Sequence, residues 1–361
     1  MDRRSFLKNS ALGGGAAAAA TLAAPAYAQG KRTLTMVTTW GRGLAGVHDS
    51  AQYCADAITA MSDGQLTVDL KAAGELVGAF EVFDAVSAGQ ADLYHGVDYY
   101  FLGQHPALSF FSQVPFGMTA QEFNNWFYHE GGRELADEVY GIFGLKFFPA
   151  GSTGPQSGGW FNKEINSPED FQGLKFRMPG QGGQVVGKLG ASVQNLPGSE
   201  VYQALSSGAI DGTEWIGPWA DEKAGFQEVA KFYYTAGFHE PGPILNITFN
   251  LELYEDLTPA QQAIVSHAAR SSNAWTMALF MANNAAALQR LQAGGVKLME
   301  FSDSIWDAFG AASDEVVKEP LGDELYKRCY DSYMTSLRSS ASWGSLSEGT
   351  YTAQRNRVVG I

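Results

Sequence analysis

Polar residues with the chemistry of a small binding site occur in four segments that are otherwise apolar or rich in glycine. An arginine guanidinium can hold a carboxylate through two parallel charge-assisted hydrogen bonds, and amide and carboxylate oxygens suit a hard cation. Together these residue types indicate a cleft for a small carboxylate with a cation beside it. The residues are Gln156, Arg177, the neighbouring pair Glu214 and Trp215, and Glu240.

The N-terminal segment has the features of an export signal. Residues 1–28 contain a twin-arginine pattern that begins at Arg3, then an apolar run, and they end in an A-x-A cleavage site. The apolar run is shorter than the roughly 20 residues needed to span a bilayer. We therefore predict a twin-arginine signal peptide cleaved after Ala28, a mature chain that begins at Gln29, and a periplasmic location.

Composition restricts the partners of the chain. There are 24 basic and 38 acidic residues, a net charge of −14, which argues against nucleic acid and anionic membrane surfaces as partners. One buried arginine can still bind a small anion at contact range. The two cysteines, Cys54 and Cys329, exclude a disulfide framework and a cysteine-based metal site. A single bridge between them stays open, although two packed free thiols is the preferred interpretation.

Signatures of enzymes and organic cofactor sites are missing from the sequence. It has no H-E-x-x-H, no G-x-x-x-x-G-K-[ST], no G-x-S-x-G, and no G-x-G-x-x-G behind its first predicted strand. Its six histidines form no close pair at metal-ligand spacing. We therefore predict that the chain is not an enzyme and holds no organic cofactor. A triad assembled by tertiary structure stays open, with an exported periplasmic enzyme as the remote alternative.

Two stretches of alternating strands and helices would position the polar residues. The first stretch has predicted strands at 33–40, 65–70 and 91–95, with helices at 47–61 and 79–87 between them. This order of elements is typical of an α/β domain with a mixed or parallel sheet.

The second stretch, 152–242, repeats this order, and Arg177 lies near the end of its predicted strand 174–178. A long helix is predicted from 258 to 293, because a capping residue and a proline open it. Such a helix spans about 50 Å, more than one small domain. It should therefore brace both halves of the molecule or follow the hinge between them. The C-terminal part, 302–346, is predicted to be mainly helical.

In its longer motifs, the chain resembles the solute-binding proteins of tripartite ATP-independent periplasmic (TRAP) transporters, of the DctP type. The most specific motifs are Leu174 to Pro179, Leu205 to Gly212, and the start of the long helix at Leu257 to Pro259. Within the family the chain looks most like the branch that binds α-keto acids and related 2-hydroxy acids. That likeness lies in residues 154–161, 213–218, 221–223 and 240–243.

The resemblance implies an α/β, two-lobe periplasmic binding protein fold with mixed sheets, a long domain-spanning helix and a helical C-terminus. After the signal peptide, lobe I would comprise residues 29–151 plus 243–300, and lobe II residues 152–242. Residues 301–361 would form a C-terminal helical segment that packs across the lobes or onto a partner subunit, as in a homodimer that exchanges a C-terminal helix.

The resemblance also implies roles for individual residues. The substrate-binding residues would be Arg177, Gln156, Trp215, Glu214, Tyr99 and Tyr100, and the metal ligands would be Gln156, Glu214, Trp215 and Glu240. The alternatives are a structural salt bridge for Arg177, a solvated loop charge for Glu240, and core packing for the two tyrosines. Two glutamates and a ligand carboxylate outweigh one arginine, an excess that a dry cleft tolerates only with a cation. Oxygen ligands favour Na⁺ or Ca²⁺, and the sequence does not decide between them.

The function that the resemblance implies is periplasmic capture of a small 2-oxo monocarboxylate, such as pyruvate or 2-oxobutyrate, with a bound metal cation. Separate membrane permease subunits would receive the ligand, since no remaining apolar stretch of the sequence reaches the length of a membrane span. Lactate, bound with calcium, or another carboxylate is the alternative ligand within the family. A sensor in place of a transporter also stays open as the partner.

Overall fold

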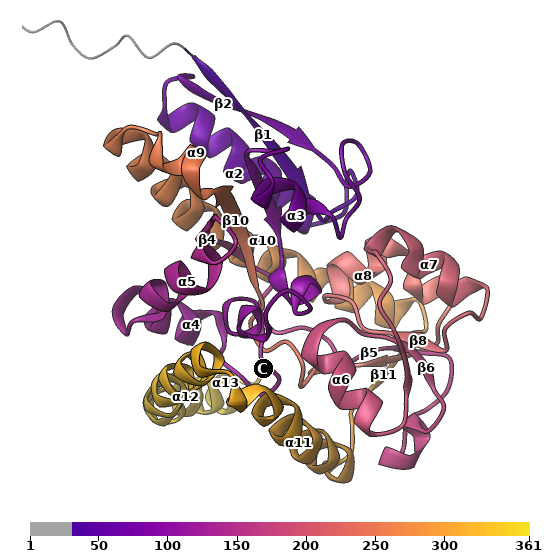
Figure 1. Cartoon of the computed structure of the whole chain (residues 1–361). Coiled ribbons are helices and arrows are strands. Elements are labelled where there is room, and N and C mark those ends of the chain that lie inside the picture. The colour runs from indigo at the N-terminus through magenta and orange to yellow at the C-terminus, as the bar shows by residue number, and fades with distance from the viewer. Residues whose placement is uncertain (1–30) are drawn as a thin grey trace, which may run out of the picture. The chain divides into compact units, whose positions relative to one another are not determined.

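The computed structural model describes residues 31–361. The predicted signal peptide and its cleavage site after Ala28 lie outside the described residues. Within the described part, the chain forms two mixed β-sheets with helices packed around them (Figure 1). None of the helices within 31–361 combines the length and the apolar character that a membrane span requires.

The first sheet has the strand order β2-β1-β3-β10-β4. Its strands are β1 (Arg32–Thr38), β2 (Leu66–Lys71), β3 (Leu93–Gly96), β4 (Leu145–Ser152) and β10 (Ile244–Asn250). β1 and β3 are parallel, whereas β10 is antiparallel to both β3 and β4. The chain therefore leaves this sheet after β4, builds most of the second sheet, and returns as β10 between two strands formed earlier.

The second sheet has the strand order β11-β9-β5-β8-β6-β7. Its strands are β5 (Gly159–Phe161), β6 (Lys175–Arg177), β7 (Ser192–Gln194), β8 (Gly212–Thr213), β9 (Phe232–Tyr234) and β11 (Lys297–Met299). β6 is parallel to both of its neighbours, and β5 is antiparallel to both of its neighbours. β8 is only two residues long, so Glu214 and Trp215 lie in the loop that follows it.

Helices and short helical turns connect these strands. Those of the first half are α2 (Val47–Met61), α3 (Val82–Ser87), η1 (Asp98–Phe101), η2 (Pro106–Phe111), α4 (Ala120–His129) and α5 (Gly132–Gly141). Those of the second half are η3 (Pro168–Phe171), α6 (Gly180–Lys188), α7 (Gly198–Ser206), α8 (Pro218–Ala224), η4 (Phe226–Glu228) and α9 (Leu251–Glu255).

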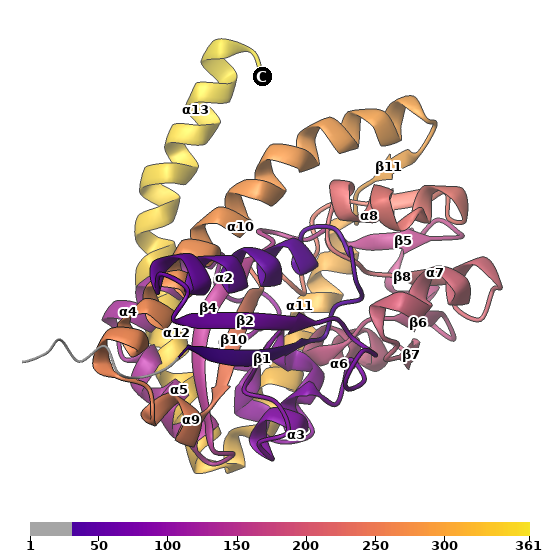
Figure 2. The same ribbon diagram turned by 90° about the horizontal axis from the view of Figure 1, so that it is seen from above.

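The predicted long helix is α10 (Pro259–Ala293), 35 residues in length. It begins at a capping box in which Thr258 and Gln261 exchange hydrogen bonds, so two of its free backbone N–H groups are satisfied locally. α10 packs on α2 and β4 beside the first sheet and on α8 beside the second, as Figure 2 shows from above. The helix therefore braces elements of both sheets, as the sequence predicts.

The C-terminal helices are α11 (Asp303–Lys318), η5 (Glu319–Gly322), α12 (Glu324–Gly344), the π-helical turn η6 (Ser345–Gly349) and α13 (Thr350–Val359). α11 packs on α6, and α12 packs on α4 and α5, where Tyr326 and Tyr333 are buried. α13 has no buried residue, and Figure 2 shows it projecting away from the rest of the described chain. The last helix therefore exposes apolar side chains, among them Tyr351, Val358 and Val359.

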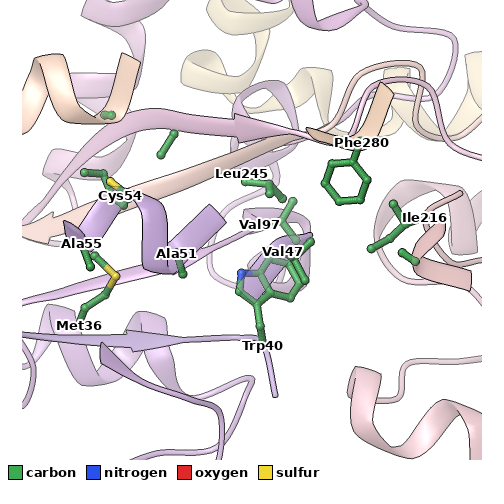
Figure 3. Packing of buried hydrophobic residues seen from close by; sticks show 14 of the residues in the cluster. Met36, Trp40, Val47, Ala51, Cys54, Ala55, Val97, Ile216, Leu245 and Phe280 are labelled. Atoms are coloured by element: carbon green, nitrogen blue, oxygen red, sulfur yellow. The ribbon is translucent and has the colours of Figure 1, made fainter. Parts of the chain in front are cut away.

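One hydrophobic cluster joins side chains from both sheets. Figure 3 shows Trp40, Val47 and Leu245 in this cluster, with Phe280 of α10 and Ile216 near them. At Gly46 the chain passes so close to Phe280 of α10 that a Cβ would lie 2.2 Å from the ring, so no other residue fits this position unless the ring moves. Several members of this cluster, among them Trp40, Val47 and Leu245, also line the cavity described below.

Both cysteines are buried free thiols, as the sequence analysis prefers. Cys54 belongs to the cluster between the sheets, whereas Cys329 of α12 lies in a second cluster with the aromatic residues of α4 and η2. Burial raises the pKa of each thiol to about 12, so neither is a reactive thiolate at neutral pH.

Candidate functional site

All of the residues singled out from the sequence line one cavity. Its empty space, with open solvent at the mouth included, is about 480 Å³. The predicted residues among its lining are Tyr99, Tyr100, Gln156, Arg177, Glu214, Trp215 and Glu240, and the apolar lining includes Trp40, Leu44, Val47, Ile216, Pro243 and Leu245. The polar lining, termed the polar end, comes from loops of both sheets, and the apolar lining, termed the apolar end, includes Trp40, Val47 and Leu245 of the cluster in Figure 3.

Neighbouring parallel strands bring Arg177 and Glu214 together. Arg177 is the last residue of β6, and it pairs in register with Thr213, the last residue of β8. Glu214 follows at once, and its backbone N–H donates to the carbonyl oxygen of Arg177 at 3.1 Å. Because both strands run in the same direction, their carboxyl ends place the two side chains side by side.

Arg177 and Glu214 form a buried ion pair through Nη1 and Oε1, with both side chains 2% exposed. The other side of the guanidinium donates to the carbonyl oxygen of Leu196 at 3.2 Å and to the hydroxyl of Tyr100 at 3.4 Å. Burial acts to lower the pKa of Arg177, but Glu214 and the tyrosines hold it above the usual value. The salt bridge weighed for Arg177 is therefore present. Both of its partners also line the cavity, so the ion pair and a role in the site are compatible.

Glu240 is buried as well, which excludes the solvated loop charge weighed for it. Its side chain is 3% exposed, and its Oε2 has no hydrogen-bond partner among the described residues. The backbone N–H of Gln156 donates to its carbonyl oxygen at 3.0 Å, which ties the two loops together. Burial first, and then the charge of Glu214, raise the pKa of Glu240 well above its usual value.

Several polar atoms at this end of the cavity are buried without a partner in the described part of the chain. They are Oε1 of Gln156, Nε1 of Trp215, Oε2 of Glu240 and both ring nitrogens of His239. The Gln156 amide donates to Oγ1 of Thr153 at 3.2 Å, which leaves its oxygen for another group. Such clustered unpartnered atoms are rare in folded proteins, and the oxygens among them fit a hard cation.

His239 is a residue that the sequence analysis missed. Its side chain is buried, and Nε2 lies 3.5 Å from Oε2 of Glu214. Glu214, His239 and Glu240 can each offer one ligand atom within 4.8 Å of the others. A search for histidine pairs overlooks this group, because it contains one histidine and two glutamates. The signal in the sequence is the direct adjacency of His239 and Glu240.

Tyr99 and Tyr100 reach the cavity from the first sheet, on η1 directly after β3. The Tyr100 hydroxyl accepts a hydrogen bond from Arg177, and Tyr99 lines the cavity together with Glu240. Their rings meet edge to face, with centroids 4.9 Å apart. Both tyrosines also pack against the hydrophobic cluster, so each one contributes to the core and lines the cavity as well.

Comparison with known proteins gives consistent results along the chain. A relative from Nostoc sp. strain PCC 7120, a monocarboxylate 2-oxoacid-binding periplasmic protein, is 41% identical over 317 residues, or 88% of this chain and 87% of the relative. A crystal structure of a TRAP periplasmic solute-binding protein from Pseudoalteromonas atlantica, with bound sodium and pyruvate, is 36% identical with a TM-score of 0.86. That likeness covers 90% of this chain and 99% of the other.

A third similar protein is a TRAP transporter solute-binding protein from Bordetella bronchiseptica. Its crystal structure is a mixed-occupancy dimer, with co-purified calcium and picolinate in one site and an apo site in the other. It is 32% identical with a TM-score of 0.90, over 92% of this chain and 99% of that one. The model of the DctP family, bacterial extracellular solute-binding protein family 7, matches residues 39–322. With well over half of its length matched, the chain belongs to this family.

Proposed function

We propose that this protein captures a small 2-oxo monocarboxylate, such as pyruvate or 2-oxobutyrate, together with Na⁺ or Ca²⁺ in the periplasm. It then delivers the ligand to the membrane subunits of a TRAP transporter. The observation that carries this proposal is the cavity itself, where one arginine lies beside unpartnered oxygens at one end and apolar side chains line the other. The ligands bound by the similar proteins from Nostoc and Pseudoalteromonas support it.

The donor set fits a hard cation. The side-chain oxygens of Gln156, Glu214 and Glu240 and the main-chain carbonyl of Trp215 would hold the ion. Two buried glutamates and a ligand carboxylate carry more negative charge than Arg177 can compensate, so either Na⁺ or Ca²⁺ would reduce the net negative charge of the site. Ca²⁺ would neutralise this charge, whereas Na⁺ would leave one negative charge, which a partly hydrated site tolerates.

Arg177 would bind the carboxylate of the ligand. Its Nη2 and Nε are held by the carbonyl oxygen of Leu196, which fixes the plane of the guanidinium. Its Nη1 faces Glu214 within the cavity, so the ligand carboxylate would approach where this contact is made. Tyr99 and Tyr100 would complete the polar end from the first sheet, with their hydroxyl groups as hydrogen-bond partners.

The apolar end favours a monocarboxylate with a short aliphatic tail. Arg177 is the one lysine or arginine among the described residues that line the cavity. A second carboxylate on the ligand would therefore be buried against Trp40 and Leu245 without a counter-charge, at a cost of several kcal/mol. The Trp40 ring is held in place because its Nε1 donates to Nδ1 of His95 at 2.9 Å. Lactate, which has the same size as pyruvate, is the alternative ligand.

The Ser50 and His95 pair is the arrangement nearest to a catalytic couple. Ser50 Oγ lies 3.1 Å from Nε2 of His95. Because the Trp40 indole donates to Nδ1, the proton of the neutral ring is on Nε2, which donates to Ser50 and cannot accept its proton. Burial lowers the pKa of His95 to about 3, so the ring stays neutral. This geometry supports a structural role and the proposal that the protein is not an enzyme.

Two lobes that close over the ligand would account for its burial. Lobe I would contain residues 29–151 and 243–300, and lobe II residues 152–242, with hinges near Gly151 and Gly242. The pairing of β11 with β9 argues for moving residues 297–299 to lobe II. The closed form would be what the membrane subunits recognise.

Export and assembly are part of the proposal. The chain would be exported by its twin-arginine signal and cleaved after Ala28. The stretch around Tyr326 to Leu337 packs on its own core, so exchange between two copies would involve the following residues. Trp343, Leu346 and Tyr351 are 71%, 72% and 66% exposed, an apolar surface that a second copy would cover. The similar protein from Bordetella bronchiseptica, which crystallised as a dimer, supports this.

Thermal unfolding of residues 29–361 tests the proposal. Pyruvate, 2-oxobutyrate, 2-oxovalerate, lactate and succinate are each added with and without a chelator, in buffers with and without sodium. A ligand at 100 times its dissociation constant stabilises the native state by about 2.7 kcal/mol, an easily measured shift. We expect shifts with the 2-oxo monocarboxylates that depend on a cation. If succinate alone shifts the transition, the proposed ligand class is wrong.

A further inference from the structure

Two buried carboxylates lie behind the walls of the cavity without lining it. Asp98 is 1% exposed and begins η1, the turn that carries Tyr99 and Tyr100. Asp221 is 0% exposed and lies in α8, directly after the loop that carries Glu214 and Trp215. Asp98 follows β3 of the first sheet, and Asp221 follows β8 of the second sheet.

Asp98 accepts hydrogen bonds from three separate elements. Its Oδ1 accepts from the hydroxyl of Tyr94 on β3 at 3.0 Å. Its Oδ2 accepts from the hydroxyl of Tyr140 on α5 and from the amide of Asn246 on β10, the latter at 2.5 Å. The start of η1 is thereby tied to β3, to the helix α5, and to β10, the strand next to β3 in the sheet.

Asp221 holds the loop after β8 in a similar way. Its Oδ1 accepts from the backbone N–H groups of Ile216 at 3.1 Å and Gly217 at 2.8 Å. Its Oδ2 accepts from Nε1 of Trp160 at 2.9 Å. Three donors therefore meet one carboxylate, and two of them are the main chain directly after Trp215.

Both carboxylates are costly to bury. The neighbours that stabilise their ionised forms are hydrogen-bond donors, and none is a lysine, arginine or histidine of the described chain. Burial raises the pKa of each to about 7 against the opposing effect of these donors. A hydrophobic residue at either position would avoid this cost but would leave three or more donors unpartnered. What the carboxylates provide instead is a fixed geometry for the two segments attached to them.

We propose that Asp98 and Asp221 are positioning residues that preset opposite walls of the binding cavity. Asp98 fixes the tyrosines of η1, and Asp221 fixes the Glu214 and Trp215 segment. This inference rests on the proposed function for its consequences in binding, but the positioning itself is independent of which ligand is bound. Because each carboxylate holds a different segment, the loss of each should have a different effect.

The two effects follow from what each segment carries. Glu214 and the Trp215 carbonyl belong to the proposed cation ligands, so a loosened 214–217 loop should weaken the cation site. Tyr99 and Tyr100 belong to the ligand side, so a loosened η1 should weaken ligand binding even when the cation is saturating. Outer residues that orient metal ligands typically contribute 10-fold to 100-fold in metal affinity.

The experiment uses Asp98→Asn and Asp221→Asn in the protein that begins at Gln29, with Asp63→Asn as an exposed control. Pyruvate binding is measured by calorimetry at saturating Ca²⁺ or Na⁺, and the cation concentration for half-maximal binding is measured at fixed pyruvate. For Asp221→Asn we expect this midpoint to rise about tenfold or more, with pyruvate affinity recovered at high cation. For Asp98→Asn we expect weaker pyruvate binding at all cation concentrations and an unchanged midpoint.

Hydrogen–deuterium exchange provides a readout that needs no ligand. Exchange of the Ile216 and Gly217 amides should accelerate in Asp221→Asn with no change in residues 98–101, and the reverse should hold for Asp98→Asn. If a variant does not fold, Trp160→Phe and Tyr140→Phe each remove one donor and test the same two segments. Equal loss of protection along the whole chain in both variants, or unchanged exchange in both, would overturn the inference. Failure of the wild type to bind pyruvate would contradict the proposed function alone.

Discussion

Arg177 and Glu214 form an ion pair within the cavity, where both side chains are 2% exposed. Removal of one partner from a buried pair typically costs 3 to 5 kcal/mol, because the other charge is left uncompensated in a medium of low polarity. The contact lies at the point where a ligand carboxylate and a cation would meet these two side chains. The same residues thus serve the stability of the unliganded cavity and, in the proposed function, the recognition of the ligand.

Replacement of Arg177 by alanine should abolish pyruvate binding and destabilise the protein. The expected loss is about 3 to 5 kcal/mol in the free energy of unfolding, since Glu214 remains buried without its partner. Arg177→Lys should keep part of the stability, because the charge remains, but little of the binding, because an ammonium group lacks the planar fork. Calorimetry and guanidinium unfolding measure the two quantities.

A matched control for Arg177 is the exposed pair of Arg42 and Glu75. Arg42 is 64% exposed in its side chain, so Arg42→Ala should change stability by less than about 1 kcal/mol and leave ligand binding intact. Wild-type affinity in Arg177→Ala would show that this arginine is only a structural ion pair.

Replacement of Glu240 by glutamine should change the free energy of unfolding in opposite directions with and without the cation. The pKa of Glu240 is raised well above its usual value, chiefly by burial. A carboxyl with a raised pKa in the folded state stabilises fully below its unfolded pKa, and that contribution is lost as the pH rises through the folded pKa. Wild type in cation-free buffer should therefore lose stability above about pH 4.5, by about 1.4 kcal/mol for each pH unit until Glu240 ionises.

Glu240→Gln should lack this decline and should be more stable than wild type at pH 8 when no cation is present. With Ca²⁺ or Na⁺ the order should reverse, because the variant has lost one charged ligand. Denaturant unfolding at several pH values, with and without the cation, measures both. The exposed Glu300→Gln serves as the control, and a parallel decline with pH in Glu240→Gln would refute the prediction.

Replacement of His239 by glutamine should weaken the cation site while pyruvate affinity at saturating cation stays near that of wild type. His239 can offer a ligand atom within 4.8 Å of those of Glu214 and Glu240, so its loss removes a group that can support the cation site. We expect about a tenfold rise in the cation concentration needed for half-maximal binding. His129→Gln, on the surface end of α4, is the control. An unchanged cation midpoint would limit His239 to a packing role.

Replacement of Trp40 by leucine should shift the preference toward longer 2-oxo acids. Trp40 lines the apolar end of the cavity and is 6% exposed, so a smaller side chain leaves space for additional methylene groups. Each buried methylene contributes about 0.8 kcal/mol, or roughly fourfold in affinity. The ratio of pyruvate to 2-oxovalerate dissociation constants measures the shift, with the exposed Trp343→Leu as control. A ratio equal to that of wild type would place the tail of the ligand elsewhere.

Removal of residues 345–361 should yield a monomer with normal ligand affinity. These residues include Leu346, Tyr351 and Val358, which expose apolar area, and none of them lines the cavity. Light scattering after size exclusion measures the mass of the full-length and shortened proteins. A full-length protein that is already monomeric at high concentration would contradict the proposed dimer, without consequence for the ligand site.

Local features of the fold follow directly from the sequence. The capping boxes at Thr119 with Glu122 and at Thr258 with Gln261 form as their residue types predict, because each hydrogen bond joins residues three positions apart. The length of α10 follows from an uninterrupted helical pattern. Side-chain chemistry also singled out five residues for the site, and the family resemblance added Tyr99 and Tyr100. All seven line one cavity.

Other features depend on residues that are distant in the chain. The insertion of β10 between β3 and β4, and of β11 beside β9, requires strand pairing across long separations, which no local pattern encodes. The same holds for the ion pair of Arg177 with Glu214.

The amino-acid sequence by itself thus determined which side chains can bind a carboxylate and a cation. It also determined where helices with local capping residues begin. Only the tertiary structure decided that Glu240 is buried, that His239 faces Glu214, and that Asp98 and Asp221 hold the cavity walls. The physical reason is that burial and electrostatic environment are properties of the surrounding elements, which the folded chain brings together, and not of the residue or its sequence neighbours.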